Sequence, residues 1–196
     1  MNRPFTSTAL LLLVSWLPAC STLVGHDITR DVEEMKMDGA QVTFHEPAHC
    51  GEPSYEVKFR PGPGIQMTIT SHSSGGLGNT WFDMQVEPGR SLAFTSTTGR
   101  IEARDGTVSD MFVANVQAAR DSHSVMKSMP ADGVMAGNAA AGDVSHYSGS
   151  FNSPARGAKA FTLQLPDAVV DGTPYRFPPI RYSARPLTYF QDACLR

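Results

Sequence analysis

The chain has 196 residues, of which 41% are hydrophobic, 18% charged and 9% aromatic. This is ordinary globular composition, and it excludes collagen-like, coiled-coil and largely disordered chains. The formal net charge of −3 at pH 7 argues against a nucleic-acid partner held through its phosphates.

The first twenty residues have the organisation of an export signal. Arg3 supplies a positive charge, Ala9 to Trp16 form an apolar run, and small residues precede Cys20. The run is much shorter than the ~20 residues that a membrane-spanning helix needs, and no later apolar run is longer. We therefore expect residues 1–19 to be a signal peptide that is removed. The mature chain, with 15 Lys and Arg against 19 Asp and Glu, is not expected to be an integral membrane protein.

The four residues Leu17-Pro18-Ala19-Cys20 resemble the lipobox of bacterial lipoproteins. The resemblance implies that Cys20 receives a diacylglycerol and an acylated amine, which anchor the protein to a membrane. Ser21, rather than Asp, follows the cysteine, and in that family this favours the outer membrane. The resemblance is confined to this segment and assigns no role beyond Cys20. The alternative is an ordinary secretory signal, cleaved near Ala19, that leaves Cys20 free.

Two further cysteines, Cys50 and Cys194, remain in a chain expected to enter an oxidising compartment. A disulfide between them is the simplest interpretation. It would close a loop of 144 positions, with a chain-entropy benefit of at most ~5 kcal/mol. The alternative is two unrelated buried thiols.

We expect residues 20–30 to form a lipidated tether, because residues 21–30 carry little apolar periodicity, and residues 31–196 to form one domain. Gly, Pro, Asn or Asp interrupts this domain every eight to twelve residues, and the segments between alternate apolar with polar side chains. This pattern predicts an all-β fold, specifically an antiparallel β-sandwich.

The clearest strands are predicted at residues 55–60, 65–70 and 161–165, where every second side chain is apolar. Weaker strands are predicted at residues 41–45, 81–87, 91–96, 100–104 and 180–190. Pro186 interrupts the last of these and suits an edge or a bend. Asp38-Gly39 and Asp105-Gly106 are typical of hairpin turns.

Residues 107–129 fit a strand and a helix about equally. They lack Gly and Pro, and their apolar residues also form a helical stripe behind Ser109. Met35 and Met37 raise the same question, because Asp31 could cap a short helix. For these we favour a strand that runs into the Asp38-Gly39 turn.

Residues 45–49, His-Glu-Pro-Ala-His, match the letters of the zinc-protease motif. That chemistry requires an uninterrupted helix, whereas Pro47 separates the two histidines and strand-like sequence follows. A loop beside a disulfide is the favoured interpretation. A copper site is a further alternative, because His45 and His49 accompany Met-x-Met and Met-x-x-Met spacings at Met35, Met37, Met126 and Met129. Methionine is, however, also a common core filler.

A hydrolase is the remaining catalytic alternative. His72, His123 and His146 lie among serines, but Ser148-Gly149-Ser150 does not complete a Gly-x-Ser-x-Gly motif. Serine beside histidine is more often a turn than a triad, because a triad is assembled in space.

We therefore expect a membrane-anchored envelope lipoprotein that binds a partner or supports an assembly, without catalysis and without a cofactor. The partner would be an envelope protein or a glycan, besides the membrane held through Cys20. We expect recognition through the loops at residues 71–79, rich in Ser and Gly, and 130–143, rich in small residues.

Overall fold

The computed structural model describes residues 26–45, 53–72, 80–119, 125–140, 142–153 and 160–191. Within these ranges the chain forms fifteen strands and no helix, so the described part contains no helix able to cross a membrane. The all-β prediction is confirmed.

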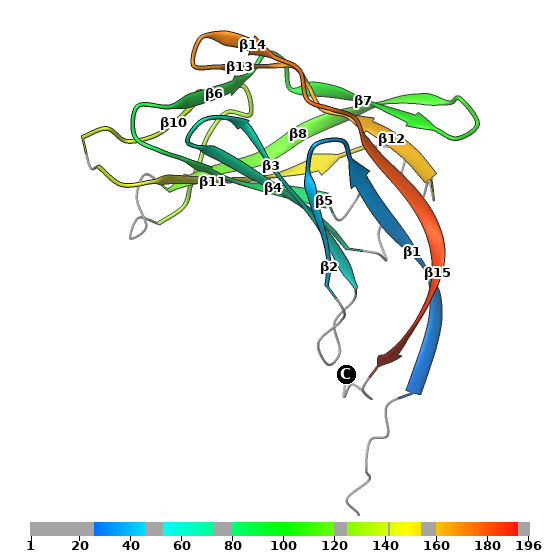
Figure 1. The fold of residues 1–196 in the computed structure, drawn as a ribbon. Helices are drawn as coiled ribbons and strands as arrows, with labels where there is room; N and C mark the ends of the chain where they lie inside the picture. The colour runs from blue at the N-terminus through cyan, green and yellow to red at the C-terminus, as the bar shows by residue number, and fades with distance from the viewer. Residues whose placement is uncertain are drawn as a thin grey trace, which may run out of the picture.

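Eleven of the strands form one large antiparallel sheet (Figure 1). Ten of them follow one another in the spatial order β1 (His26–Met37), β15 (Ile180–Gln191), β12 (Ala160–Gln164), β7 (Thr98–Ala103), β8 (Val108–Ala119), β11 (Ser145–Asn152), β5 (Thr80–Val86), β4 (Ile65–His72), β3 (Ser54–Gly62) and β2 (Gln41–His45). The eleventh, β9 (Lys127–Ser128), pairs with β8 outside this order.

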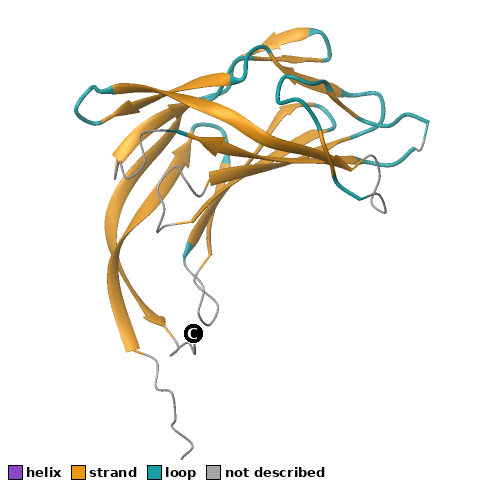
Figure 2. Cartoon of the chain, turned by 180° about the vertical axis from the view of Figure 1, so that it is seen from behind, coloured by secondary structure: helices purple, strands orange, loops and turns teal. Residues whose placement is uncertain are grey.

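A second sheet of four short strands covers part of the large one. Its order is β10 (Met135–Ala136), β6 (Ser91–Phe94), β13 (Ala168–Val170) and β14 (Thr173–Tyr175). This small sheet lies across the end of the large sheet that is uppermost in Figure 1, and Figure 2 shows the same two layers from behind. Leu92 and Phe94 of β6 are buried together with the inner face of the large sheet, so the two layers share one core, as in a sandwich.

The large sheet curls until it is nearly closed. Its terminal strands β1 and β2 are joined by the predicted Asp38-Gly39 turn, and β1 also contacts β3. Arg185 Nη2 of β15 donates a hydrogen bond to the Tyr55 hydroxyl of β3 at 3.0 Å. The curl therefore brings the two ends of the sheet together around the core.

Alternation along each strand decides which side chains fill this core. On β3, Tyr55, Val57 and Phe59 are buried, whereas Glu56 and Lys58 between them face outward. Burying each large apolar side chain contributes about 1.5–3 kcal/mol. The strands predicted from this alternation are all present.

The segment at residues 107–129 is a long strand followed by the short strand β9, and the helical alternative is wrong. A bulge at Asn115, whose φ is +54°, shifts the register of β8 against β11. The buried positions therefore fall at Met111, Val113, Val116 and Ala119. Spacings of two and then three residues resemble a helical stripe, which explains the ambiguity of the sequence.

Strand β1 begins at His26, so the last five residues of the segment expected to be a tether lie in the sheet. Met35 and Met37 are in this strand, as favoured from the sequence. Pro186 lies in the part of β15 that pairs with β1 alone, because β12 pairs only with Ile180–Ser183. Among the described strands, one side of β15 therefore has no neighbour at the proline, as expected for an edge.

Candidate functional site

Several residues singled out in the sequence lie outside the described part of the chain. These are Cys20, His49, Cys50, His123 and Cys194. The loop at residues 71–79 is described only at Ser71 and His72, whereas most of the loop at residues 130–143 is described. The lipid site and the disulfide therefore remain expectations.

His45 is the last residue of β2, so the zinc-protease letters begin in a strand. Its Nε2 lies 3.2 Å from Oε2 of Glu56 on the neighbouring strand, and Nζ of Lys58 lies 3.2 Å from the same oxygen. Desolvation of the Glu56 carboxylate opposes its ionisation, but the hydrogen bonds from Lys58 and His45 outweigh this and lower its pKa. His45 is thus part of a charge cluster on the outer face of the sheet.

Trp81 lies on the same outer face and contacts two polar side chains. Its ring centroid is 5.0 Å from that of His72, and its indole N–H donates a hydrogen bond to the Asp83 carboxylate. Although Asp83 reaches the surface, desolvation of its carboxylate raises its pKa in spite of that bond, and the charge of Glu56 adds to the effect.

Two of the histidines proposed for a hydrolase, His72 and His146, lie in the described part of the chain. In the described ranges, neither His72 nor His146 has a hydrogen bond to a serine or an acidic side chain. Ser148, Gly149 and Ser150 lie in strand β11, which is not the strand-to-helix turn of a nucleophile elbow.

The methionines named for copper are divided between the core and the surface. Met35 and Met37 are 0% and 5% exposed and belong to the core, whereas Met126 is exposed and Met129 packs against the core from outside. Two core residues cannot contribute to an exposed carrier site. No group of three His, Cys, Asp or Glu able to hold a metal occurs within the described ranges.

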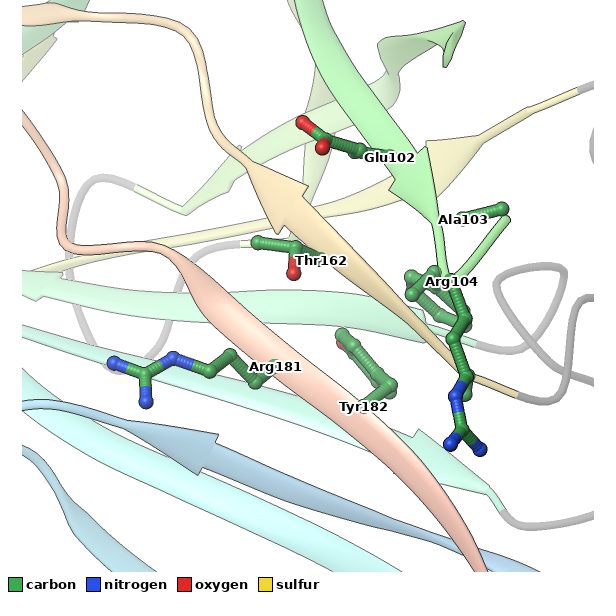
Figure 3. Close-up of a pocket in the computed structure, with 8 residues that line it drawn as sticks. Glu102, Ala103, Arg104, Thr162, Arg181 and Tyr182 are labelled. Carbon is green, nitrogen blue, oxygen red and sulfur yellow. The ribbon is translucent and has the colours of Figure 1, made fainter. Parts of the chain in front are cut away.

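A hollow of about 370 Å³ lies over β7, β12 and β15 (Figure 3). Its lining includes Arg104, Arg181 and Tyr182, and the ring of Tyr182 stacks on Phe161 with centroids 4.2 Å apart. Figure 3 shows the two guanidinium groups pointing away from each other on opposite sides of Tyr182. Arg181 also bonds to Asp38, so the two arginines do not converge on one anion.

A second hollow, of about 460 Å³, lies beside the loop at residues 130–143. We call it the β9 hollow; its lining residues are Ala118, Val125, Lys127, Ser128, Met129, Val134 and Tyr147. Val125 is 80% exposed and Val134 65% exposed. The hollow therefore presents apolar side chains to solvent.

The wall of the β9 hollow is well supported. Tyr147 of β11 is nearly buried, and its hydroxyl accepts a hydrogen bond from the Ala136 N–H at 2.9 Å and donates one to the Ala136 carbonyl at 2.7 Å. This pair of bonds connects β11 of the large sheet to β10 of the small sheet. The hollow thus lies where the two layers meet, on a rigid support.

The sequence indicated one side of this hollow, through the loop that contains Val134, and missed the other. Val125 and Lys127 lie in the segment that was ambiguous between helix and strand. The apolar pair Val125-Met126 within a polar stretch was the available signal.

Comparisons with protein-family models, with curated proteins and with solved structures found no match to this chain.

Proposed function

We propose that this chain is a lipid-anchored protein of the bacterial envelope that binds a protein partner through the β9 hollow and performs no covalent chemistry. The observation that carries the proposal is the exposure of Val125 and Val134 at a hollow supported by two packed sheets. Exposed apolar groups gathered in a depression are typical of interaction sites. Of the two partner classes expected from the sequence, a protein fits this lining better than a glycan.

The location rests on the sequence. The lipobox-like residues Leu17 to Cys20 and the following Ser21 support attachment to the outer membrane. Residues 21–25 separate Cys20 from the first strand, so the anchor would hold the domain within a few residues of the membrane surface. The anchor would raise the local concentration of the binding surface at the membrane, where a partner in the same compartment would encounter it.

Site-specific photo-crosslinking in the producing cells tests the partner. A benzophenone amino acid placed at Val125 or at Val134 should give the same discrete adduct with another protein. The matched control is Val108, which is 50% exposed on β8 and does not line the hollow. An adduct of equal yield from Val108, or no adduct from the hollow, would overturn the assignment.

The anchor is tested separately by the intact mass of the protein purified from membranes of the same cells. We expect the mass of residues 20–196 plus two or three acyl groups. Replacement of Cys20 by Ala should abolish the added mass and release the protein from the membrane fraction. A mass without acyl groups would remove the anchor from the proposal and leave the binding site untouched.

A further inference from the structure

Strand β9 lies at the edge of the large sheet. It pairs with the C-terminal part of β8, where Ala118 lies opposite Lys127 and Gln117 opposite Ser128. Strand β7, which pairs with the other part of β8, reaches only as far as the pair Thr98–Phe112. No strand follows β9 in the described part of the chain, so among the described residues its far side is unpaired; we call it the free edge.

The backbone groups on that free edge can be identified from the pairing. The N–H of Met129 donates to the carbonyl of Val116 at 2.9 Å. Because bonding alternates along an antiparallel ladder, Lys127 and Met129 turn their backbone groups toward β8, and Ser128 turns its N–H and C=O away. No described group bonds to these two atoms of Ser128.

The same pairing places the side chain of Lys127 at the β9 hollow. Residues opposite one another in a ladder share a face, so Lys127 lies on the face of Ala118, which lines the hollow. Val125, Ser128 and Met129 also line the hollow. A strand added to the free edge would direct every second side chain over this hollow.

The charge at the hollow favours one kind of added strand. Lys127 is exposed and forms no ion pair with any described residue. A carboxylate on the incoming segment would complement it, and an apolar side chain would cover Val125 and Val134.

We propose that the β9 hollow receives an extended segment of the partner protein. The segment adds as a strand to the edge of β9, bonds to the backbone of Ser128, and places an apolar side chain in the hollow and a carboxylate beside Lys127. This proposal rests on the proposed function and specifies the mode of binding at the same site.

The probe is a random library of linear twelve-residue peptides, displayed on phage and selected against the mature protein in detergent. We expect the selected peptides to share an apolar and an acidic residue with alternating polarity. Their synthetic versions should bind Ser128→Pro at least about tenfold more weakly, because proline removes the outward N–H and spares both bonds to β8. Ser128→Ala, which changes only the side chain, should bind as the unaltered protein does.

Two further variants separate the contribution of the Lys127 charge from that of the apolar lining. Lys127→Glu should bind the acidic peptides about fivefold more weakly than the unaltered protein does. It should bind more tightly those peptides in which Lys replaces the acidic residue. Val134→Asp should weaken both sets. The melting temperatures of all variants, measured alongside, show whether each remains folded.

Failure of the selection to enrich peptides, or equal binding to Ser128→Pro and Ser128→Ala, would overturn strand addition. The proposed function would survive that result if the photo-crosslink from Val134 persisted in the Ser128→Pro protein, because the partner would then bind by a folded surface. If the benzophenone at position 134 gave no adduct even in the protein that keeps Ser128, the proposed function itself would be overturned.

Discussion

Gly149 of β11 lies directly opposite Phe82 of β5 in the large sheet. A Cβ atom at this position would be 2.5 Å from Cε1 of Phe82, closer than real side chains approach one another. Phe82 is fully buried and contacts the rings of Phe94 and Phe151, at centroid distances of 6.1 and 5.4 Å. The packing of the aromatic core therefore requires a residue without a side chain at this position, between Ser148 and Ser150.

Gly149→Ala should lower the free energy of unfolding by about 1–3 kcal/mol, because the added methyl group forces Phe82 from its position. Urea unfolding followed by fluorescence would measure this. Ser148→Ala is the matched control, since Ser148 is the neighbouring position on the outer face of the same strand; its midpoint should hardly change. Equal midpoints for the two variants would show that the core accommodates the methyl group.

Asp83 gives a prediction about pH. Its pKa in the folded protein is raised from the usual 3.8, so the native state binds the proton more tightly than the unfolded chain. The protein consequently loses stability as the pH rises from about 3.8 through the folded pKa. Asp83→Asn keeps an acceptor for the Trp81 N–H and removes the ionisation.

Asp83→Asn should therefore have a slightly higher melting temperature than the unaltered protein at pH 7, and this advantage should disappear at pH 3. Calorimetry at both values measures the difference. The effect is small because the carboxylate is partly solvated. A variant that is less stable at pH 7 would show that the charged bond to Trp81 outweighs the desolvation.

At the scale of single residues, much of the candidate chemistry could be judged from the sequence. Pro47 and the strand-like surroundings argued against a helix at His45, and His45 is the last residue of strand β2. Core methionines could be expected from the frequency of methionine as a filler. The cluster of His45, Glu56 and Lys58 could not, because it depends on which strand lies beside β2.

At the scale of elements, β8 shows how one residue changes a pattern. Asn115 has a positive φ, and its Nδ2 donates to Oγ of Ser150 across the ladder at 3.0 Å. Asparagine tolerates this left-handed conformation better than most residues. The bulge it forms changes which face is buried along the second half of β8, and so helps to direct Ala118 toward the hollow.

Asn115→Val should destabilise the protein by about 1–2 kcal/mol, because a β-branched residue is strained at this φ. Asn115→Gly relieves the backbone and loses only the bond to Ser150, so it should be the milder of the two. Thermal unfolding compares them. If valine were tolerated better than glycine, the bulge would not need its left-handed residue.

Alternation predicted strands such as β3, β4 and β12, but it did not predict β10, β11, β13 or β14, and it did not give the order of the strands in the sheet. Neighbours such as β12 and β7, or β11 and β5, are distant in sequence, and no turn signal specifies them. The free edge of β9 is a consequence of that order. For this reason the loop beside the candidate site was predictable and the site itself was not.

At the scale of the whole molecule, the end of β2 and the end of β15 lie at the same end of the fold, the lower one in Figures 1 and 2. Cys50 follows the last residue of β2 by five positions, and Cys194 follows the last residue of β15 by three. Both cysteines lie outside the described residues, so the disulfide between them stays a prediction from the sequence.

A reductant should lower the melting temperature of the mature protein by about 5 to 15 °C, since a bond closing so long a loop contributes several kcal/mol. The double variant Cys50→Ser with Cys194→Ser should melt at the lower temperature with or without reductant. Free-thiol titration of the denatured protein provides the second readout. Two titratable thiols before reduction would contradict the bond.

The pairing of β1 with β15 has a consequence for how the chain acquires its structure. His26 lies opposite Gln191 and Met37 opposite Ile180, so the first strand can find its neighbour only after almost the whole polypeptide is available. Contacts of such sequence separation slow folding, because the intervening loop must be closed first. During synthesis the charged strand β1 would therefore stay unpaired until β15, the last strand to be made, completes the sheet.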